Sequence, residues 1–266
     1  MLLDVMDAED RDPLPFGPET RAYRAARGVR LFHASVRHQL RNASPCWDEG
    51  RYGAPVNQDD LLGTLGVFTV VVIDSLRAMG ARISQADRDA YVHLWLVTGH
   101  LMGIDYEELF PGGRSHPERP PLNYEELRVV ICEHYLRQSG FTMDGIRLQR
   151  ALLEAQRLSY PKRLRRVLAG LPGASVRYFL GDEAAEDLGL PDANWTRHLF
   201  VLMRPFNAVR TYAYHADLIA GVVRRRSYGL FTRYIKEATR GREAAWRLDP
   251  LLPRRARGRT APSVRA

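Results

Sequence analysis

The stretch GVRLFHASVRHQL, residues 28–40, decides the fold of this 266-residue chain. Within it and just before it, apolar side chains recur in steps of three and four, and His33 falls in the same series. The series comprises Ala22, Ala26, Val29, His33, Val36 and Leu40. This spacing places all six on one face of an α-helix, which we predict to run from Pro18 to about Leu40. Because strict alternation is sustained nowhere in the chain, we predict an all-α fold.

Further helices are predicted from the same periodicity and from capping pairs at their starts. Asn57 with Asp60, Ser84 with Asp87 and Asn123 with Glu126 each have the spacing of a helix cap. The expected helices are 57–79, 84–103, 123–140, 143–159, 161–169, two short helices within 171–191, a segment 194–220 and a last helix 227–240. Pro205 should kink or split the segment 194–220.

The composition indicates one globular domain followed by a basic tail. Apolar residues make up 45% of the chain and charged residues 26%, which is sufficient for a sizeable core. We predict a single domain over residues 1–250 and a disordered tail over 251–266. The net charge of +8 is mostly this tail, since five arginines and no acid lie in the last thirteen residues. The charge by itself is therefore only weak support for a nucleic-acid partner, and we do not expect one.

The sequence lacks the motifs and segments that mark several classes of protein. Cys46 and Cys132 are far apart and form no CxxC or CxxCH motif, and no P-loop, GxGxxG, GxSxG or HExxH motif is present. The first residues are acidic where a secretory signal is basic. The longest apolar run, Leu61–Ile73, is shorter than the roughly 20 residues of a membrane span. The sequence as written thus predicts a cytoplasmic protein without a membrane span.

His33 is the main candidate metal ligand, because an imidazole on an apolar helix face can bind a metal through one ring nitrogen. Arg30 and Arg37 lie one turn away on the same face, where they could meet anionic groups. A haem, with its iron, apolar body and carboxylate edges, would match this surface. The alternative is a hydrogen-bonded core histidine. A rival ligand pair, His93 and His100, lies seven residues apart on another predicted helix.

Several segments together resemble a known family. These are GVRLFHASVRHQL, then GAPVNQDDLLGTLGVFTVVVIDSLRAMG, then AYVHLWLVTGHLMGID, and finally LPGASVRYFLGDEAAEDLGLP. Their order is similar to that in the latex-clearing rubber oxygenases and their relatives in the mycophenolate-pathway oxygenase family. The resemblance implies a globin-like helical fold around a non-covalent b-type haem, with His33 as the proximal iron ligand. It also implies dioxygen and an apolar, unsaturated or isoprenoid substrate.

The sequence departs from the family pattern at its start. The family carries an Arg and a Lys-Thr pair on a helix upstream of the haem histidine, and that place falls before or at Met1 here. Either the true start lies upstream or the distal groups are lacking, so the sequence identifies no catalytic residue. Two other functions are compatible with the sequence: a non-catalytic haem- or lipid-binding protein, and a helical module that binds nucleic acid or a partner through its basic tail.

Overall fold

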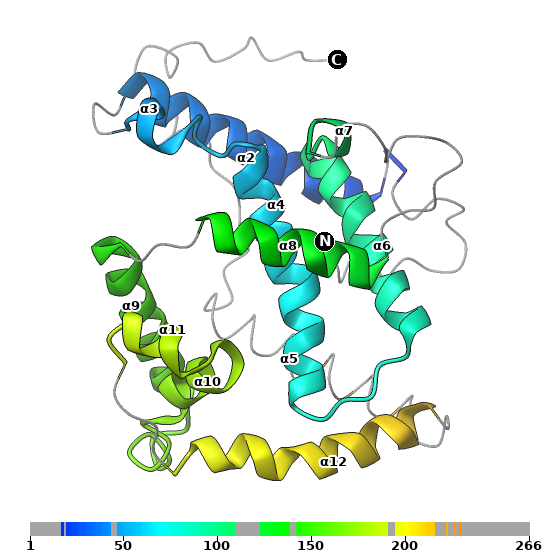
Figure 1. Cartoon of the computed structure of the whole chain (residues 1–266), viewed down its shortest axis with the longest axis vertical. Helices are drawn as coiled ribbons and strands as arrows, with labels where there is room; N and C mark the ends of the chain where they lie inside the picture. The colour runs from blue at the N-terminus through cyan, green and yellow to red at the C-terminus, as the bar shows by residue number, and fades with distance from the viewer. Residues whose placement is uncertain are drawn as a thin grey trace, which may run out of the picture. The chain divides into compact units, whose positions relative to one another are not determined.

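The computed structural model describes residues 17–18, 20–43, 47–109, 123–138, 142–190 and 195–215, together with Val222, Arg226 and Gly229. Every regular element within these ranges is helical, which confirms the all-α prediction (Figure 1). The predicted helix 227–240, the loop with His116 and the basic tail lie outside the described residues.

The described helices follow one another along the chain. In chain order they are α2 (Arg21–Ala43), α3 (Glu49–Tyr52), α4 (Gln58–Gly66), the π-helical segment η1 (Val67–Val71), α5 (Val72–Ala78), α6 (Gln85–Met102), α7 (Tyr106–Leu109), α8 (Tyr124–Gln138), α9 (Met143–Ser159), α10 (Leu171–Leu180), α11 (Asp182–Asp187) and α12 (Arg197–His215). α4, η1 and α5 follow one another without a break and correspond to the predicted helix 57–79. The one-turn helices α3 and α7 fall in segments where no helix was predicted.

Packing divides the chain into two compact units. The first comprises Met1–Phe68, Asp89–Glu126 and Arg233–Ala266, and the second Thr69–Arg88 and Leu127–Thr232. Both boundaries near residues 68 and 126 fall inside helical stretches, so no linker marks them. The single domain over residues 1–250 stays a prediction.

The predicted helix starts are confirmed in atomic detail. The Asn57 side chain accepts a hydrogen bond from the Asp60 N–H (2.9 Å), and the Asp60 carboxylate accepts one from the Asn57 N–H (3.0 Å). Asn123 and Glu126 form the same reciprocal pair at α8. Ser84 accepts from the Asp87 N–H at the start of α6 (3.1 Å). Local capping chemistry therefore fixes these three starts, as the spacing predicts.

The core of the first unit is formed by α2, α4 and α6. Fully or nearly fully buried side chains come from all three helices and include Ala26, Leu62, Leu65 and Val92. Trp95 on α6 is 4% exposed and stacks on Phe68, with ring centroids 4.8 Å apart. The stacking of Phe68 on Trp95 packs η1 against α6, and α2 contributes the buried Ala22 and Ala26.

The stretch Gln58–Ala78 is long and apolar enough, by length and composition, to cross a membrane, and it is alone in this among the described residues. Core helices meet the same criteria. Leu62 and Leu65 are buried in the first unit, and Val70 and Ile73 are buried in the second. The side chains of this stretch therefore serve as core in both units.

One expectation about the second unit is wrong, and another is narrowed. Residues 161–169 form a series of turns instead of a helix, with isolated bonds such as Leu164 N–H to Pro161 O (2.8 Å). Arg165 donates to the carbonyls of Leu158 and Tyr160 at the end of α9, which ties the segment back. Of the two outcomes predicted for Pro205, the split does not occur, because α12 continues through it (Figure 1), and the kink stays a prediction. The exposed turn before Pro205 allows water to satisfy the carbonyl that loses its partner.

Candidate functional site

The candidate site is the face of α2 that bears Arg30, His33 and Arg37. Thr20 begins the helix, since its hydroxyl accepts from the Tyr23 N–H (3.2 Å) and its carbonyl from the Arg24 N–H (3.1 Å). With this start, α2 places Ala26, Arg30, His33 and Arg37 on one face, as the sequence predicts.

His33 lies half-buried near the middle of α2. Its Nδ1 is buried without a hydrogen-bond partner, and neither ring nitrogen bonds to a described residue. Nε2 is the more open of the two. A buried ring nitrogen without a partner is costly, so the usual alternative of a hydrogen-bonded core histidine does not describe this residue.

The electrostatic environment of His33 favours the neutral ring. Burial, and secondarily the positive charge of Arg37, lower the pKa of His33 below its usual 6.5. A neutral imidazole is the form that binds a metal, and binding through Nε2 leaves the proton on Nδ1. The ring is therefore in the protonation state of a metal ligand at neutral pH.

Arg37 is bonded to the backbone of the segment before α4. Its Nε donates to the Pro55 carbonyl (3.0 Å) and its Nη2 to the Val56 carbonyl (2.5 Å). Pro55 is fully buried, and Val56 has a φ of +54°, a strained conformation for a β-branched residue. Arg37 thus holds this turn against α2, and its nearest partners are carbonyl oxygens of the protein.

Arg30 lies against the loop that follows α6. Its Nε would be 3.3 Å from a Cβ placed on Gly103, which has a φ of +101° and so favours glycine. Gln58 fixes this loop by donating to the Gly103 carbonyl (3.1 Å) and accepting from the Asp105 N–H (3.0 Å). Both flanking arginines therefore contact backbone segments of the first unit, and their predicted role toward carboxylate groups stays a prediction.

The remaining histidines are less suited to hold a metal. His93 and His100 are exposed on α6, and His38 is exposed and pairs with Asn42 (3.2 Å). His198 is also exposed, and the His215 side chain lies outside the described part. Within the described ranges, no three His, Cys, Asp or Glu side chains gather into a metal cluster. A haem iron needs only one such ligand from this face.

His134 on α8 is the buried histidine that the sequence reasoning missed. It is 4% exposed and its ring centroid lies 5.8 Å from that of Tyr135. Tyr124, Leu127 and Ile131 precede it at helical spacing and are buried. The helical spacing of apolar residues that identified His33 as a candidate would also have identified His134.

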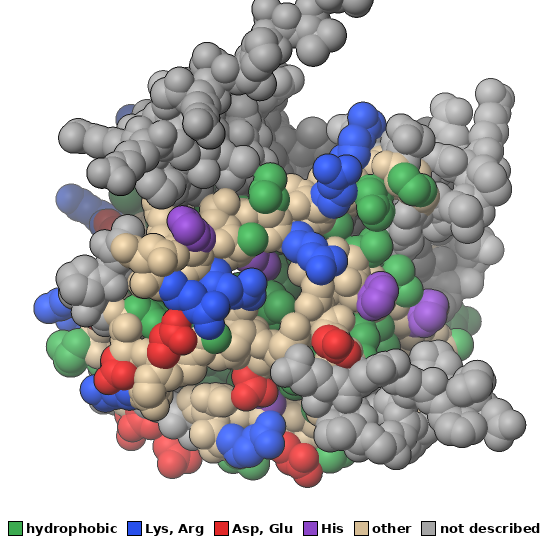
Figure 2. Space-filling model, turned by 90° about the horizontal axis from the view of Figure 1, so that it is seen from above, with side chains coloured by type: hydrophobic (Ala, Val, Ile, Leu, Met, Phe, Trp, Pro, Cys, Tyr) green, Lys and Arg blue, Asp and Glu red, His purple; other side chains and the backbone are tan. Residues whose placement is uncertain are grey.

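Basic side chains are spread over the face drawn in Figure 2, whereas acidic ones lie mainly toward one edge of it. Two further arginine clusters, at residues 163–166 and 224–226, could contact phosphates, and the second is only partly described. Arg163 and Arg166 are exposed in the turns after α9, and Arg165 is bonded to α9 carbonyls. Arg224 and Arg225 lie outside the described residues.

Comparison with known proteins defines the class. Residues 14–212 match the family described as "ER-bound oxygenase mpaB/B'/Rubber oxygenase, catalytic domain". The chain belongs to this family, because the match covers most of its length. The resemblance found in the sequence is thereby confirmed.

Two relatives make the relationship specific. The chain is 35% identical over 170 residues to the rubber oxygenase of Streptomyces sp. (strain K30). The aligned part is 61% of this chain and 36% of that protein, so the chain spans about a third of the relative's length. A solved structure of latex clearing protein in its closed state superimposes with a TM-score of 0.59 and 26% identity, over 74% of this chain and 49% of that one.

Proposed function

We propose that this chain is a haem-dependent oxygenase acting on an apolar, unsaturated or isoprenoid substrate, with His33 as the axial ligand of a non-covalent b-type haem. The observation that carries the proposal is the half-buried imidazole of His33, whose Nδ1 has no partner and whose pKa is lowered. Membership of an oxygenase family supports the reaction class. The relative's name, rubber oxygenase, supports a substrate with carbon–carbon double bonds.

The residues of the site fit such a group. Nε2 of His33 is available to an iron, and no described side chain competes for it. Arg37 favours the neutral ring through its charge and keeps the turn at Pro55 and Val56 in place beneath it. Arg30, at the other end of this face, is the second candidate partner for a carboxylate edge. Bound haem would supply an iron that activates dioxygen for oxidation of the substrate double bond.

A hemin titration followed by absorption spectroscopy tests the proposal. We expect wild-type protein to give a Soret band with a one-to-one stoichiometry and the His33→Ala variant to lose it. His134→Ala and the His93→Ala/His100→Ala double variant are the controls, and both should keep the band. An unchanged band in His33→Ala would exclude His33 as the ligand.

Oxygen consumption then separates an oxygenase from a binding protein. Haem-loaded protein with a soluble isoprenoid should consume dioxygen faster than the same protein without it. A normal Soret band without substrate-dependent uptake would favour the non-catalytic haem-binding alternative.

A further inference from the structure

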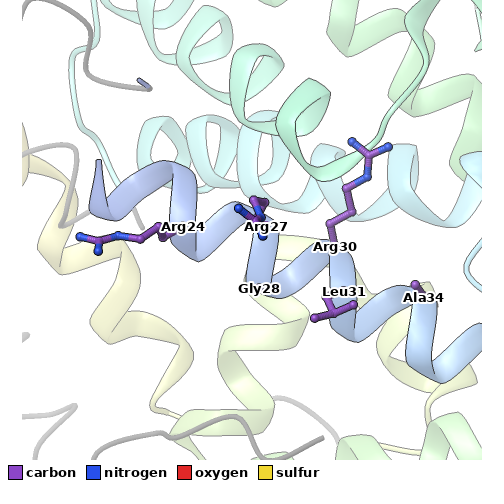
Figure 3. A pocket seen from close by; sticks show the side chains of 6 residues that line it. All are labelled: Arg24, Arg27, Gly28, Arg30, Leu31 and Ala34. Carbon is purple, nitrogen blue, oxygen red and sulfur yellow. The ribbon is translucent and has the colours of Figure 1, made fainter. Parts of the chain in front are cut away.

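A cavity of about 580 Å³ lies along α2 and reaches from Arg24 to Ala34. Its lining includes Arg24, Arg27, Gly28, Arg30, Leu31 and Ala34 (Figure 3). Successive helix residues turn by about 100°, so Arg24 and Leu31 point almost directly away from His33. The volume is in the range typical of pockets for small molecules. The cavity therefore adjoins the candidate haem face at Arg30, whereas Arg24, Gly28 and Leu31 lie away from His33.

The side chains of Arg24 and Arg27 have no counter-charge among the described residues. Neither side chain forms an ion pair or hydrogen bond with a described residue, and no carboxylate is among the lining residues. Some exposed arginines elsewhere are paired, such as Arg41 with Glu49 (2.7 Å) and Arg157 with Glu154 (2.6 Å). Like charges three residues apart on a helix repel, so this arrangement destabilises the unliganded helix.

Gly28 is a second destabilising feature at the same place. It lies in the interior of a 23-residue helix, where glycine is less favourable than alanine. Packing does not require it, since a Cβ at this position would meet nothing within 4 Å. By contrast, a Cβ on the helical Gly99 would lie 2.4 Å from the Tyr106 hydroxyl. Gly28 therefore leaves space in the cavity, although no packing contact of the described protein requires a glycine there.

We propose that this cavity binds a single-chain lipid with an anionic head group, which lies along α2. Arg24 and Arg27, at the amino-terminal end, provide donors for a carboxylate or phosphate. Gly28, Leu31 and Ala34 continue as an apolar floor toward the other end, and Leu31 is 52% exposed in the absence of a ligand. Arg24 and Ala34 are separated by about 15 Å along the helix axis, which accommodates an extended alkyl chain. Figure 3 shows Arg24 and Arg30 leaving the helix in different directions, with Arg27 between them along the helix.

Lipid binding to the haem-free full chain tests this proposal independently of the proposed function. A fluorescent polyene fatty acid would be bound first and then displaced with oleate or oleyl phosphate. We expect saturable one-to-one binding, with affinity reduced at least tenfold in the Arg24→Gln/Arg27→Gln variant. Gly28→Leu, which fills the floor but suits a helix, should also reduce it at least tenfold. The matched control Arg163→Gln/Arg166→Gln removes two exposed arginines elsewhere and should bind like wild type.

The head group and the tail are tested separately. Oleyl alcohol, which lacks the charge, should displace the probe at least tenfold less well than oleate, and the better of the two anionic lipids identifies the head group. Binding that is unchanged in both cavity variants would overturn the proposal, as would an equal loss in the control variant. Circular dichroism of each variant checks that α-helix content is retained.

Discussion

On one face of α2, Arg37 donates to two backbone carbonyls and His33 lies half-buried. On the other face, the Arg24 and Arg27 side chains have no counter-charge within the described part of the chain, and Gly28 leaves open space. The first face is integrated into the packing of the first unit. The second is accessible and bears features that weaken a bare helix. The difference indicates that one helix can be fixed by backbone hydrogen bonds on one side while its other side stays open, which is the arrangement that the two proposed sites require.

Arg37→Gln should have the largest effect on this comparison. The change removes two charge-assisted hydrogen bonds and leaves the carbonyls of Pro55 and Val56 without their donor. We expect the free energy of unfolding to fall by about 2–4 kcal/mol, measured by urea denaturation. Arg41→Gln, which breaks only the exposed pair with Glu49, should cost less than about 1 kcal/mol. An equal loss of unfolding free energy in the two variants would mean that the hydrogen bonds of Arg37 stabilise the protein no more than an exposed ion pair does.

Gly99→Ala should destabilise the protein by about 1–3 kcal/mol, because overpacking forces neighbours to move. The added Cβ would lie 2.4 Å from the Tyr106 hydroxyl and 2.9 Å from the Ile104 Cδ1. The melting temperature should fall accordingly. Stability equal to that of wild type would show that the close approach of α6 to Tyr106 is not required.

The sequence predicts those parts of the structure that depend on neighbours within one or two helix turns. The caps at Asn57, Ser84 and Asn123 and the common face of Arg30, His33 and Arg37 were predicted correctly, since each depends on spacing alone. The bonds from Arg37 to Pro55 and Val56 connect residues 18 and 19 positions apart, across a turn whose course the sequence does not specify. The failure at residues 161–169 has a similar cause, because Arg165 bonds back to the end of α9.

The pH dependence of stability tests the environment of His33. Its pKa is lowered in the folded state, so the unfolded chain binds a proton more readily near and below pH 6.5. Stability contributed by the neutral ring is therefore complete above pH 6.5 and is lost as the pH falls through the lower folded-state pKa. The free energy of unfolding of haem-free protein, measured from pH 7.5 to 5, should fall more steeply for wild type than for His33→Leu. If the free energy of unfolding depended on pH in the same way in both proteins, the pKa of His33 would not be lowered in the folded state.

Gly28→Ala should give the smallest effect, and it should have the opposite sign. Alanine is the better helix former, and the space around Gly28 accepts a methyl group without a clash, so we expect stabilisation by about 0.5–1 kcal/mol. The contrast with Gly99→Ala then follows from packing alone, because both glycines lie in helix interiors. A gain in the urea midpoint accompanied by weaker lipid binding would show that the exposed face of α2 retains glycine for its ligand. A loss of stability would instead mean that a segment of the protein fills the space beside Gly28, and the two faces of the helix would no longer differ in kind.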